Sequence, residues 1–218
     1  QKLEEEGVRF YRHSFPQRFY REQGRVVLEY VREGASETVM ADALLLATGR
    51  KPDVEALRPE IAGVVLEQKR VRTDEQLRTT APHIFAAGDC VGPFGLTHAA
   101  EYQAQLAVRN AFGAEELADY GFFGWCTFTD PELAGMGLTE AKAREIYGER
   151  VRVYRQEYRE IHRGLSDDKL RGLLKVICDE AGAILGATII GERAAELINE
   201  LTAAAKAGMK LQELAGVT

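Results

Sequence analysis

Residues 84–89 read Ile84-Phe85-Ala86-Ala87-Gly88-Asp89: four apolar residues, a glycine and then a carboxylate. A short apolar run of this kind is typical of a strand that is buried on both faces, as in a parallel sheet. Ligands of such sheets bind outside the carboxyl ends of the strands, where glycine allows close approach and a carboxylate can hold a sugar hydroxyl. The segment therefore predicts a ligand-binding strand end, and a plain strand followed by an Asp-containing turn fits these residues equally well.

A second apolar run, Leu44-Leu45-Leu46-Ala47, lies upstream and ends in the loop Thr48-Gly49-Arg50-Lys51-Pro52. It predicts another strand of the same buried kind. Downstream of residue 89 the chain is rich in turn residues, and apolar positions then recur at helical spacing from about residue 97 to residue 112. Gly113 supplies a plausible helix stop. Two buried strands and a helix indicate an α/β region built on a parallel sheet.

Beyond a linker over residues 115–124, the pattern changes to alternating strands and amphipathic helices. The change of pattern predicts a domain boundary near residue 119. Asp179-Glu180-Ala181-Gly182 is a hairpin signal between two of the strands. The predicted strands span residues 125–129, 151–158, 173–178 and 184–190, and the predicted helices span 139–148, 193–207 and 210–215.

Composition excludes several classes of protein. The 218 residues are 45% hydrophobic with a net charge of −6, which argues against a nucleic-acid partner, since phosphate binding needs clustered basic residues. The short basic run Gln68-Lys69-Arg70 is interpreted as a solvated face. No apolar stretch approaches the roughly 18 residues that span a bilayer. The three cysteines form no CxxC pair, so we expect no metal site and a reducing, cytoplasmic setting.

Several segments resemble motifs of the pyridine nucleotide-disulfide oxidoreductases, in the family's order. Leu44–Pro52 is similar to the second Ala-Thr-Gly segment of that family, and Thr79–Asp89 resembles its second flavin-binding motif. The family's dimerisation domain opens with a stretch like Cys126–Glu132 followed by Gly137–Glu140. Residues 184–191 and 195–198 match a later strand and helix of that domain. The dihydrolipoamide dehydrogenase and mercuric reductase branches are the most similar.

The resemblance implies a fold and a domain organisation. Residues 1–43 would be the end of an NAD(P)-binding domain, and residues 44–118 the C-terminal part of a Rossmann-like, parallel-sheet FAD-binding domain. Residues 119–218 would be an α+β dimerisation domain with an antiparallel sheet and helices, truncated at its C-terminus, and would form a homodimer. The chain is therefore expected to be a C-terminal fragment of a longer flavoprotein.

The resemblance also implies which residues contact the cofactor. Asp89 would accept a hydrogen bond from the FAD ribitol chain, and Gly88 would leave room for that approach. The helix start would direct backbone N–H groups at the pyrimidine edge of the flavin. Gly49 and Arg50 would lie where the chain returns from the NAD(P) domain to the FAD domain. The helix-start residues are Leu96, Thr97, His98 and Ala99.

Three features that the family needs for catalysis are absent from this sequence. It contains no G-x-G-x-x-G dinucleotide fingerprint, no paired redox cysteines, and no counterpart of the family's C-terminal His-Glu pair. The resemblance implies that the parent protein is an FAD-dependent enzyme that passes electrons from NAD(P)H to a disulfide, metal ion or quinone. Because the three features are absent, the chain alone is expected to be inactive, with no catalytic residue and no retained cofactor. The alternatives are an isolated homodimerisation module and a ferredoxin-reductase relative, which shares the Ala-Gly-Asp motif.

Overall fold

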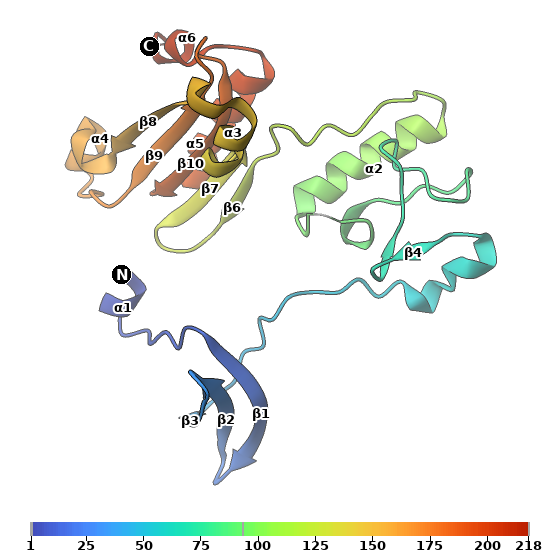
Figure 1. The fold of residues 1–218 in the computed structure, drawn as a ribbon, viewed down its shortest axis with the longest axis vertical. Helices are drawn as coiled ribbons and strands as arrows, with labels where there is room; N and C mark the ends of the chain where they lie inside the picture. Colours follow the sequence, from blue (N-terminus) through green and yellow to red (C-terminus); the bar gives the residue numbers. More distant parts are fainter. Residues whose placement is uncertain (1, 93, 218) are drawn as a thin grey trace. The chain divides into compact units, whose positions relative to one another are not determined.

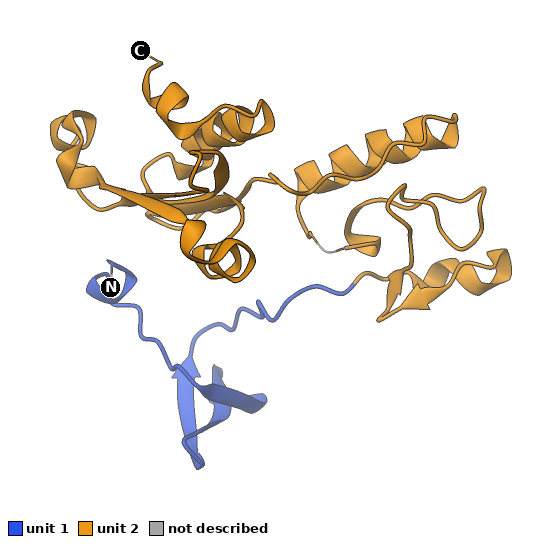
Figure 2. Cartoon of the chain, turned by 45° about the horizontal axis from the view of Figure 1, so that its top comes forward, with its two compact units in different colours: residues 1–51 blue, residues 52–218 orange. Residues whose placement is uncertain are grey.

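The computed structural model describes residues 2–92 and 94–217. The chain forms two compact units, residues 1–51 and residues 52–218 (Figure 2). The boundary in sequence lies between Lys51 and Pro52.

The first unit is an antiparallel meander. A short helix, α1 (Lys2–Glu5), precedes β1 (Ser14–Glu22), β2 (Arg25–Arg32) and β3 (Ala35–Ala41), which pair in that order. The central strand β2 carries the buried residues Val26, Val27 and Tyr30. The Tyr30 hydroxyl donates a hydrogen bond to Glu37 on β3 at 2.8 Å, so the one polar side-chain atom of these three residues is paired.

The first part of the second unit is built around one long helix. Helix α2 (Thr97–Ala111) confirms the helical spacing in the sequence, and its buried face carries Leu106 and Ala107, which pack against Leu77. Around α2 the chain forms short elements and loops. These elements are the 3-10 helices η1 (Glu55–Leu57), η2 (Pro59–Ala62) and η3 (Gly88–Cys90), and the paired strands β4 (Leu66–Glu67) and β5 (Arg70–Val71).

The two apolar runs that we expected to be buried parallel strands are not strands in this structure. Leu44–Ala47 is irregular, and Leu45 is 87% exposed. Ile84–Ala87 forms no strand either, and its Phe85 makes an isolated antiparallel bridge with Arg78. The apolar runs report a tendency to be buried, but a strand also needs a neighbour to pair with, and the described residues supply no parallel partner to either segment.

A five-stranded antiparallel sheet organises the rest of the second unit (Figure 1). Strands β6 (Trp125–Thr127) and β7 (Glu132–Gly137) pair with each other, as do β8 (Arg152–Glu157) and β9 (Leu173–Cys178). Strand β10 (Ile184–Gly191) pairs with both β7 and β9, which gives the order β6-β7-β10-β9-β8. The antiparallel sheet expected from the sequence is confirmed, with β7 as a strand that the sequence did not predict.

Helices cover both faces of this sheet. Because successive side chains of a strand point to opposite faces, Val176 and Cys178 face α5 (Ala194–Lys206), whereas Ile177 packs with Ala143 of α3 (Glu140–Tyr147). The sheet is thus buried on both sides. The remaining elements are η4 (Gly148–Arg150), η5 (Tyr158–Glu160), α4 (His162–Ser166) and α6 (Leu211–Ala215).

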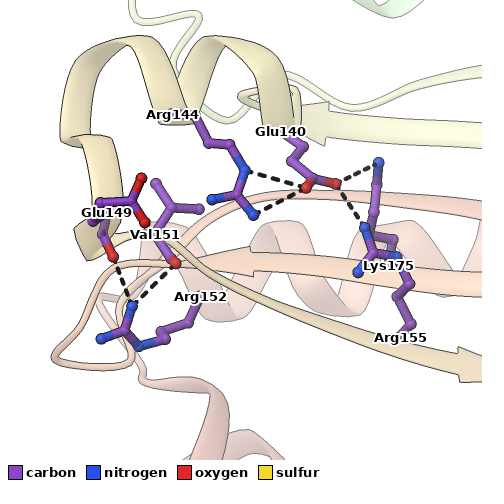
Figure 3. Close-up of polar contacts among 7 residues, drawn as sticks. All are labelled: Glu140, Arg144, Glu149, Val151, Arg152, Arg155 and Lys175. Atoms are coloured by element: carbon purple, nitrogen blue, oxygen red, sulfur yellow. Dashed lines mark hydrogen bonds and ion pairs between the residues drawn. The ribbon is translucent and has the colours of Figure 1, made fainter.

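An ion cluster fixes the start of α3 to the sheet (Figure 3). The Glu140 carboxylate lies 2.8 Å from Arg155 on β8, 3.2 Å from Arg144 on its own helix and 3.4 Å from Lys175 on β9. Partial desolvation raises the pKa of Glu140, but the hydrogen bonds from Arg144 and Lys175, together with the positive charges of Arg155 and Lys175, outweigh it and lower the pKa of this carboxyl. The cluster therefore joins three elements through one ionised side chain.

Replacement of Ile189 by alanine tests the face of the sheet that packs on α5. Ile189 is 2% exposed and its neighbour on the same strand, Ile190, is 41% exposed. We expect Ile189→Ala to lower the free energy of unfolding by about 2–5 kcal/mol, because it removes buried methyl groups and leaves a cavity. Urea unfolding followed by the fluorescence of Trp125, the only tryptophan and a residue of this sheet, measures the change. Equal losses for Ile189→Ala and the matched control Ile190→Ala would contradict the assigned faces.

The low pKa of Glu140 predicts a stability difference that depends on pH. A carboxyl whose pKa is lower in the folded chain stabilises the fold above its unfolded pKa, near the ordinary value of 4.5, and that contribution disappears as the pH falls through the folded pKa. We expect Glu140→Gln to be less stable than the native chain at neutral pH and to match it in strong acid. Thermal unfolding between neutral and acidic pH measures the difference. Glu149→Gln, which removes an exposed carboxylate next to α3, is the control, and a difference for Glu140→Gln that does not change with pH would refute the ion-cluster assignment.

Candidate functional site

The candidate site is centred on a tight loop, residues 88–92, that follows the segment at residues 84–87 and lies against α2. Gly88 opens this loop with φ of +85°, a left-handed conformation that favours glycine. Gly88 is buried, and a Cβ at this position would lie 3.4 Å from the Cβ of Ala100 on α2. The sequence therefore places a glycine where the chain must turn sharply and pack closely on the helix.

Asp89 is the second residue of the loop, and its side chain is exposed beside α2. Among residues 2–92 and 94–217, no side chain or backbone group forms a hydrogen bond or ion pair with the Asp89 carboxylate. The carboxylate is therefore available to accept hydrogen bonds from a molecule outside the chain, and hydroxyl or N–H donors suit it.

The start of α2 presents free backbone donors. Leu96 is the N-cap residue, and its side chain offers no acceptor to the first-turn N–H groups. No acidic residue lies in the first turn, so the positive end of the helix dipole is not neutralised by the helix itself. Thr97 and His98 are exposed, whereas Ala99 is fully buried against the core. This helix start therefore suits a group that carries carbonyl oxygens or negative charge.

The His98 side chain is engaged in a hydrogen bond and a ring contact within the chain. Its Nε2 lies 2.8 Å from the carbonyl oxygen of Gly124, which can only accept, so Nε2 carries the proton in this bond. The imidazole also stacks on Phe123, with ring centroids 4.8 Å apart. The side chain thus ties the start of α2 to the segment that leads into β6, in agreement with a backbone role for His98 at the site.

Sequence reasoning missed Gln103. This residue is 0% exposed on the packed face of α2, and it lies at helical spacing from Ala99 and Ala107. A polar residue in an otherwise apolar stripe is the signal that identifies such a position, because a buried amide requires hydrogen-bond partners. Its carbonyl oxygen accepts a hydrogen bond from the Gly88 N–H at 2.7 Å, so Gln103 belongs to the site.

Arg70 was interpreted from the sequence as part of a solvated basic run, and the structure corrects this for that residue. Arg70 is half-buried in β5, and its guanidinium occupies the place where Gly92 would carry a Cβ. Gly92 has φ of +68°, so glycine is favoured there by both conformation and space. A cationic side chain thus lies against the same loop that carries Asp89.

Of the predicted site residues, the structure brings together those of the second unit. Gly88 and Asp89 in η3 lie against α2, where Gly88 meets Ala100 and Gln103, and Leu96–Ala99 begin the same helix. Gly49 and Arg50 belong to the first unit, where both are exposed. Gly49 has φ of +106° and open space on the Cβ side.

The cysteine thiols are poor nucleophiles at neutral pH. Cys178 is fully buried in β9, and this burial raises its pKa to about 11. Burial also raises the pKa of Cys90, whose Sγ lies 3.1 Å from the Ala87 carbonyl oxygen, and of Cys126. Within the described residues the cysteines are free, and no group of His, Cys, Asp and Glu side chains is arranged to hold a metal ion.

A separate groove of about 680 Å³ lies between the α5 face of the sheet and the segments around α4 and α6. None of the predicted site residues lines it. Apolar side chains from strands and helices form most of its wall, among them Leu174, Val176, Leu197, Leu201, Leu211 and Leu214.

The helices within residues 2–92 and 94–217 include none with the length and apolar character of a membrane span.

Two family models match the chain, and both describe the same group of proteins. The model of "pyridine nucleotide-disulphide oxidoreductase" matches residues 1–104, and the model of its dimerisation domain matches residues 124–218. Together they cover nearly the whole chain, in the order expected from the sequence motifs.

Curated relatives and solved structures agree with these matches. The dihydrolipoyl dehydrogenase of Thermus scotoductus is 35% identical over 191 residues, which are 87% of this chain and 41% of that protein. The Bacillus subtilis dihydrolipoyl dehydrogenase is 33% identical over 93% of this chain and 44% of its own length. The chain therefore spans less than half the length of these relatives.

The structural matches extend over the same regions. The crystal structure of LpdA from Mycobacterium tuberculosis superimposes with a TM-score of 0.90 and 25% identity, over 98% of this chain and 46% of that one. The flavoprotein disulfide reductase RclA from Escherichia coli gives a TM-score of 0.80 and 28% identity, over 93% of this chain and 46% of that one. The fold class and the resemblance inferred from the motifs are confirmed. The chain belongs to the pyridine nucleotide-disulfide oxidoreductase family.

Proposed function

We propose that the protein containing this chain is an FAD-dependent oxidoreductase that passes electrons from NAD(P)H through FAD to a disulfide, metal ion or quinone. Membership of the family supports this activity. The observation that carries the proposal is the unpartnered Asp89 carboxylate, held by the Gly88 turn against α2, a helix whose first turn has no side-chain cap. FAD supplies the redox chemistry when bound, and the residues of this chain bind and orient it.

The chemistry of the loop and helix start fits FAD. Asp89 would accept a hydrogen bond from a ribitol hydroxyl, and Gly88 would keep side-chain atoms out of its path. The N–H groups at the start of α2 would donate to the pyrimidine edge of the flavin. The helix dipole would stabilise negative charge there by about 0.3–2 kcal/mol. The helix-start residues are Leu96, Thr97, His98 and Ala99.

The domain organisation completes the proposal. Residues 1–43 would be the end of the NAD(P)-binding domain, and residues 44–118 would be the C-terminal part of the FAD-binding domain. Gly49 and Arg50 would lie where the chain returns from the first of these domains to the second. The chain contains no paired redox cysteines, so its residues do not select among a disulfide, a metal ion and a quinone as electron acceptor. It contains no dinucleotide fingerprint either, so its residues do not select between NADH and NADPH. We assign no catalytic residue to this chain, and we place the protein in the cytoplasm.

A second function concerns residues 119–218, which would form the interface of a homodimer. The match of residues 124–218 to the family's dimerisation domain favours it. This region also has its own core between the sheet and α5, so it can present a defined surface to a second copy. A dimerisation module without cofactor is the alternative reading of the isolated chain.

Replacement of Asp89 by alanine tests the flavin contact. A hydrogen bond to a charged group contributes about 1.5–3 kcal/mol, so we expect the FAD dissociation constant of the whole protein to rise about tenfold to a hundredfold. Titration of the apoprotein with FAD, followed by flavin fluorescence, measures the affinity. Glu67→Ala removes an exposed carboxylate from β4 and should leave the affinity unchanged. Unaltered FAD binding in Asp89→Ala would refute the assignment.

The isolated chain of 218 residues separates the two functions. We expect it to be colourless after purification, because it contains neither dinucleotide fingerprint, and to sediment as a dimer through residues 119–218. Absorbance in the flavin region and sedimentation velocity provide the two measurements. Stoichiometric flavin in the purified chain would show that the fingerprints are dispensable for binding, and a strict monomer would argue against the dimerisation module.

A further inference from the structure

Gln103 bridges both ends of the loop that carries Asp89. Its carbonyl oxygen accepts from the Gly88 N–H at 2.7 Å, and its Nε2 donates to the Gly92 carbonyl oxygen at 3.3 Å. The two glycines flank the carboxylate in sequence, and both have positive φ. One buried amide therefore sets the separation between the points where this loop begins and ends.

The hydrogen bonds fix the orientation of the amide. The Gly88 N–H can only donate and the Gly92 carbonyl can only accept, so a flipped Gln103 would oppose both groups. The second N–H of Gln103 points to the hydroxyl oxygen of Tyr120 at 2.9 Å. The carbonyl and both N–H groups of Gln103 are thus paired in a dry site, where such bonds are strong and an unpaired group is costly.

Tyr120 connects this amide to the segment between α2 and β6. Its ring lies 5.2 Å from that of Phe94, just before α2, and 6.2 Å from that of Phe123, with the distances taken between centroids. Phe123 in turn stacks on His98 at the helix start. Gln103 therefore connects the loop of Asp89, through Tyr120, to an aromatic cluster next to the segment that leads into β6.

We propose that Gln103 is a positioning residue: it holds the loop from Gly88 to Gly92 on α2 so that the Asp89 carboxylate is presented to FAD, and Tyr120 braces it. This inference rests on the proposed flavin site. Asp89 has no partner among the described residues that would hold it in place, so its position follows from the backbone that Gln103 fixes.

The principal test replaces Gln103 by leucine in the whole protein. Leucine keeps the apolar packing but leaves the Gly88 N–H and the Gly92 carbonyl without their buried partner. We expect the FAD dissociation constant to rise about tenfold or more. Gln105→Leu is the matched control, because Gln105 is exposed on the same helix, two residues away. Equal effects of the two substitutions would overturn the proposal.

A double-mutant cycle with Asp89→Ala separates positioning from a general loss of structure. If Gln103 acts through the carboxylate, Gln103→Leu weakens FAD binding much less when Asp89 is already alanine. Full additivity would overturn the positioning role and leave the Asp89 contact intact. An Asp89→Ala protein with native FAD affinity would overturn both the contact and the positioning role, so the two failures are distinguishable.

Hydrogen–deuterium exchange gives a measurement that does not depend on FAD. In the apoprotein, peptides that cover residues 84–92 should exchange faster in Gln103→Leu than in the native protein, because the Gly88 amide loses its acceptor. Unchanged exchange in these peptides would contradict the proposal that Gln103 holds the loop on α2.

Tyr120→Phe is the milder variant, to be used if Gln103→Leu does not fold. It removes one hydrogen bond, and it should raise the FAD dissociation constant several-fold, with the same dependence on Asp89; native affinity would overturn the proposal.

Discussion

The buried hydrogen bond from the Gly88 N–H to the Gln103 carbonyl oxygen is the constraint on which the arrangement of the site depends. It holds a turn with a left-handed residue against the packed face of α2, where a displaced loop would leave two dry polar groups unpaired. That turn determines the position of the exposed Asp89 carboxylate. A buried hydrogen bond between an amide side chain and the backbone thus determines where an exposed carboxylate lies.

The second unit combines a large apolar core with a smaller region that carries the proposed flavin site. The five-stranded sheet is covered by α5 on one face and α3 on the other, and it contains the largest buried apolar cluster described in the chain. The region around α2 has a much smaller apolar cluster and relies on hydrogen-bonded loops. Because His98 bonds to Gly124 and Gln103 bonds to Tyr120, the loops are anchored on the segment that enters the sheet. A well-packed domain therefore supports a less densely packed one.

Much of the fold followed from local patterns in the sequence, and the exceptions have physical causes. Helix α2 and the β9–β10 hairpin were predicted because their apolar spacing and turn residues are local. Strand β7 was missed because Gly135 and Gly137 weaken its strand signal. The segment Ile84–Ala87 was wrongly predicted as a strand, because pairing depends on a partner that its own sequence does not encode. Gly88 and Asp89 were found through a motif, and their contact with FAD stays a prediction. Gln103 was missed because its role exists only after α2 packs on the loop.

The order of the strands has a consequence for synthesis on the ribosome. Strands β6 and β7 form one hairpin, and β8 and β9 form a second pair, but β10 lies between them and is made last. Until β10 emerges from the exit tunnel, β7 and β9 each have one unpaired edge, and unpaired edges invite association with other nascent chains. The final strand therefore closes the sheet in a single late event, and the vulnerable interval during translation lasts until Ile184–Gly191 has left the tunnel.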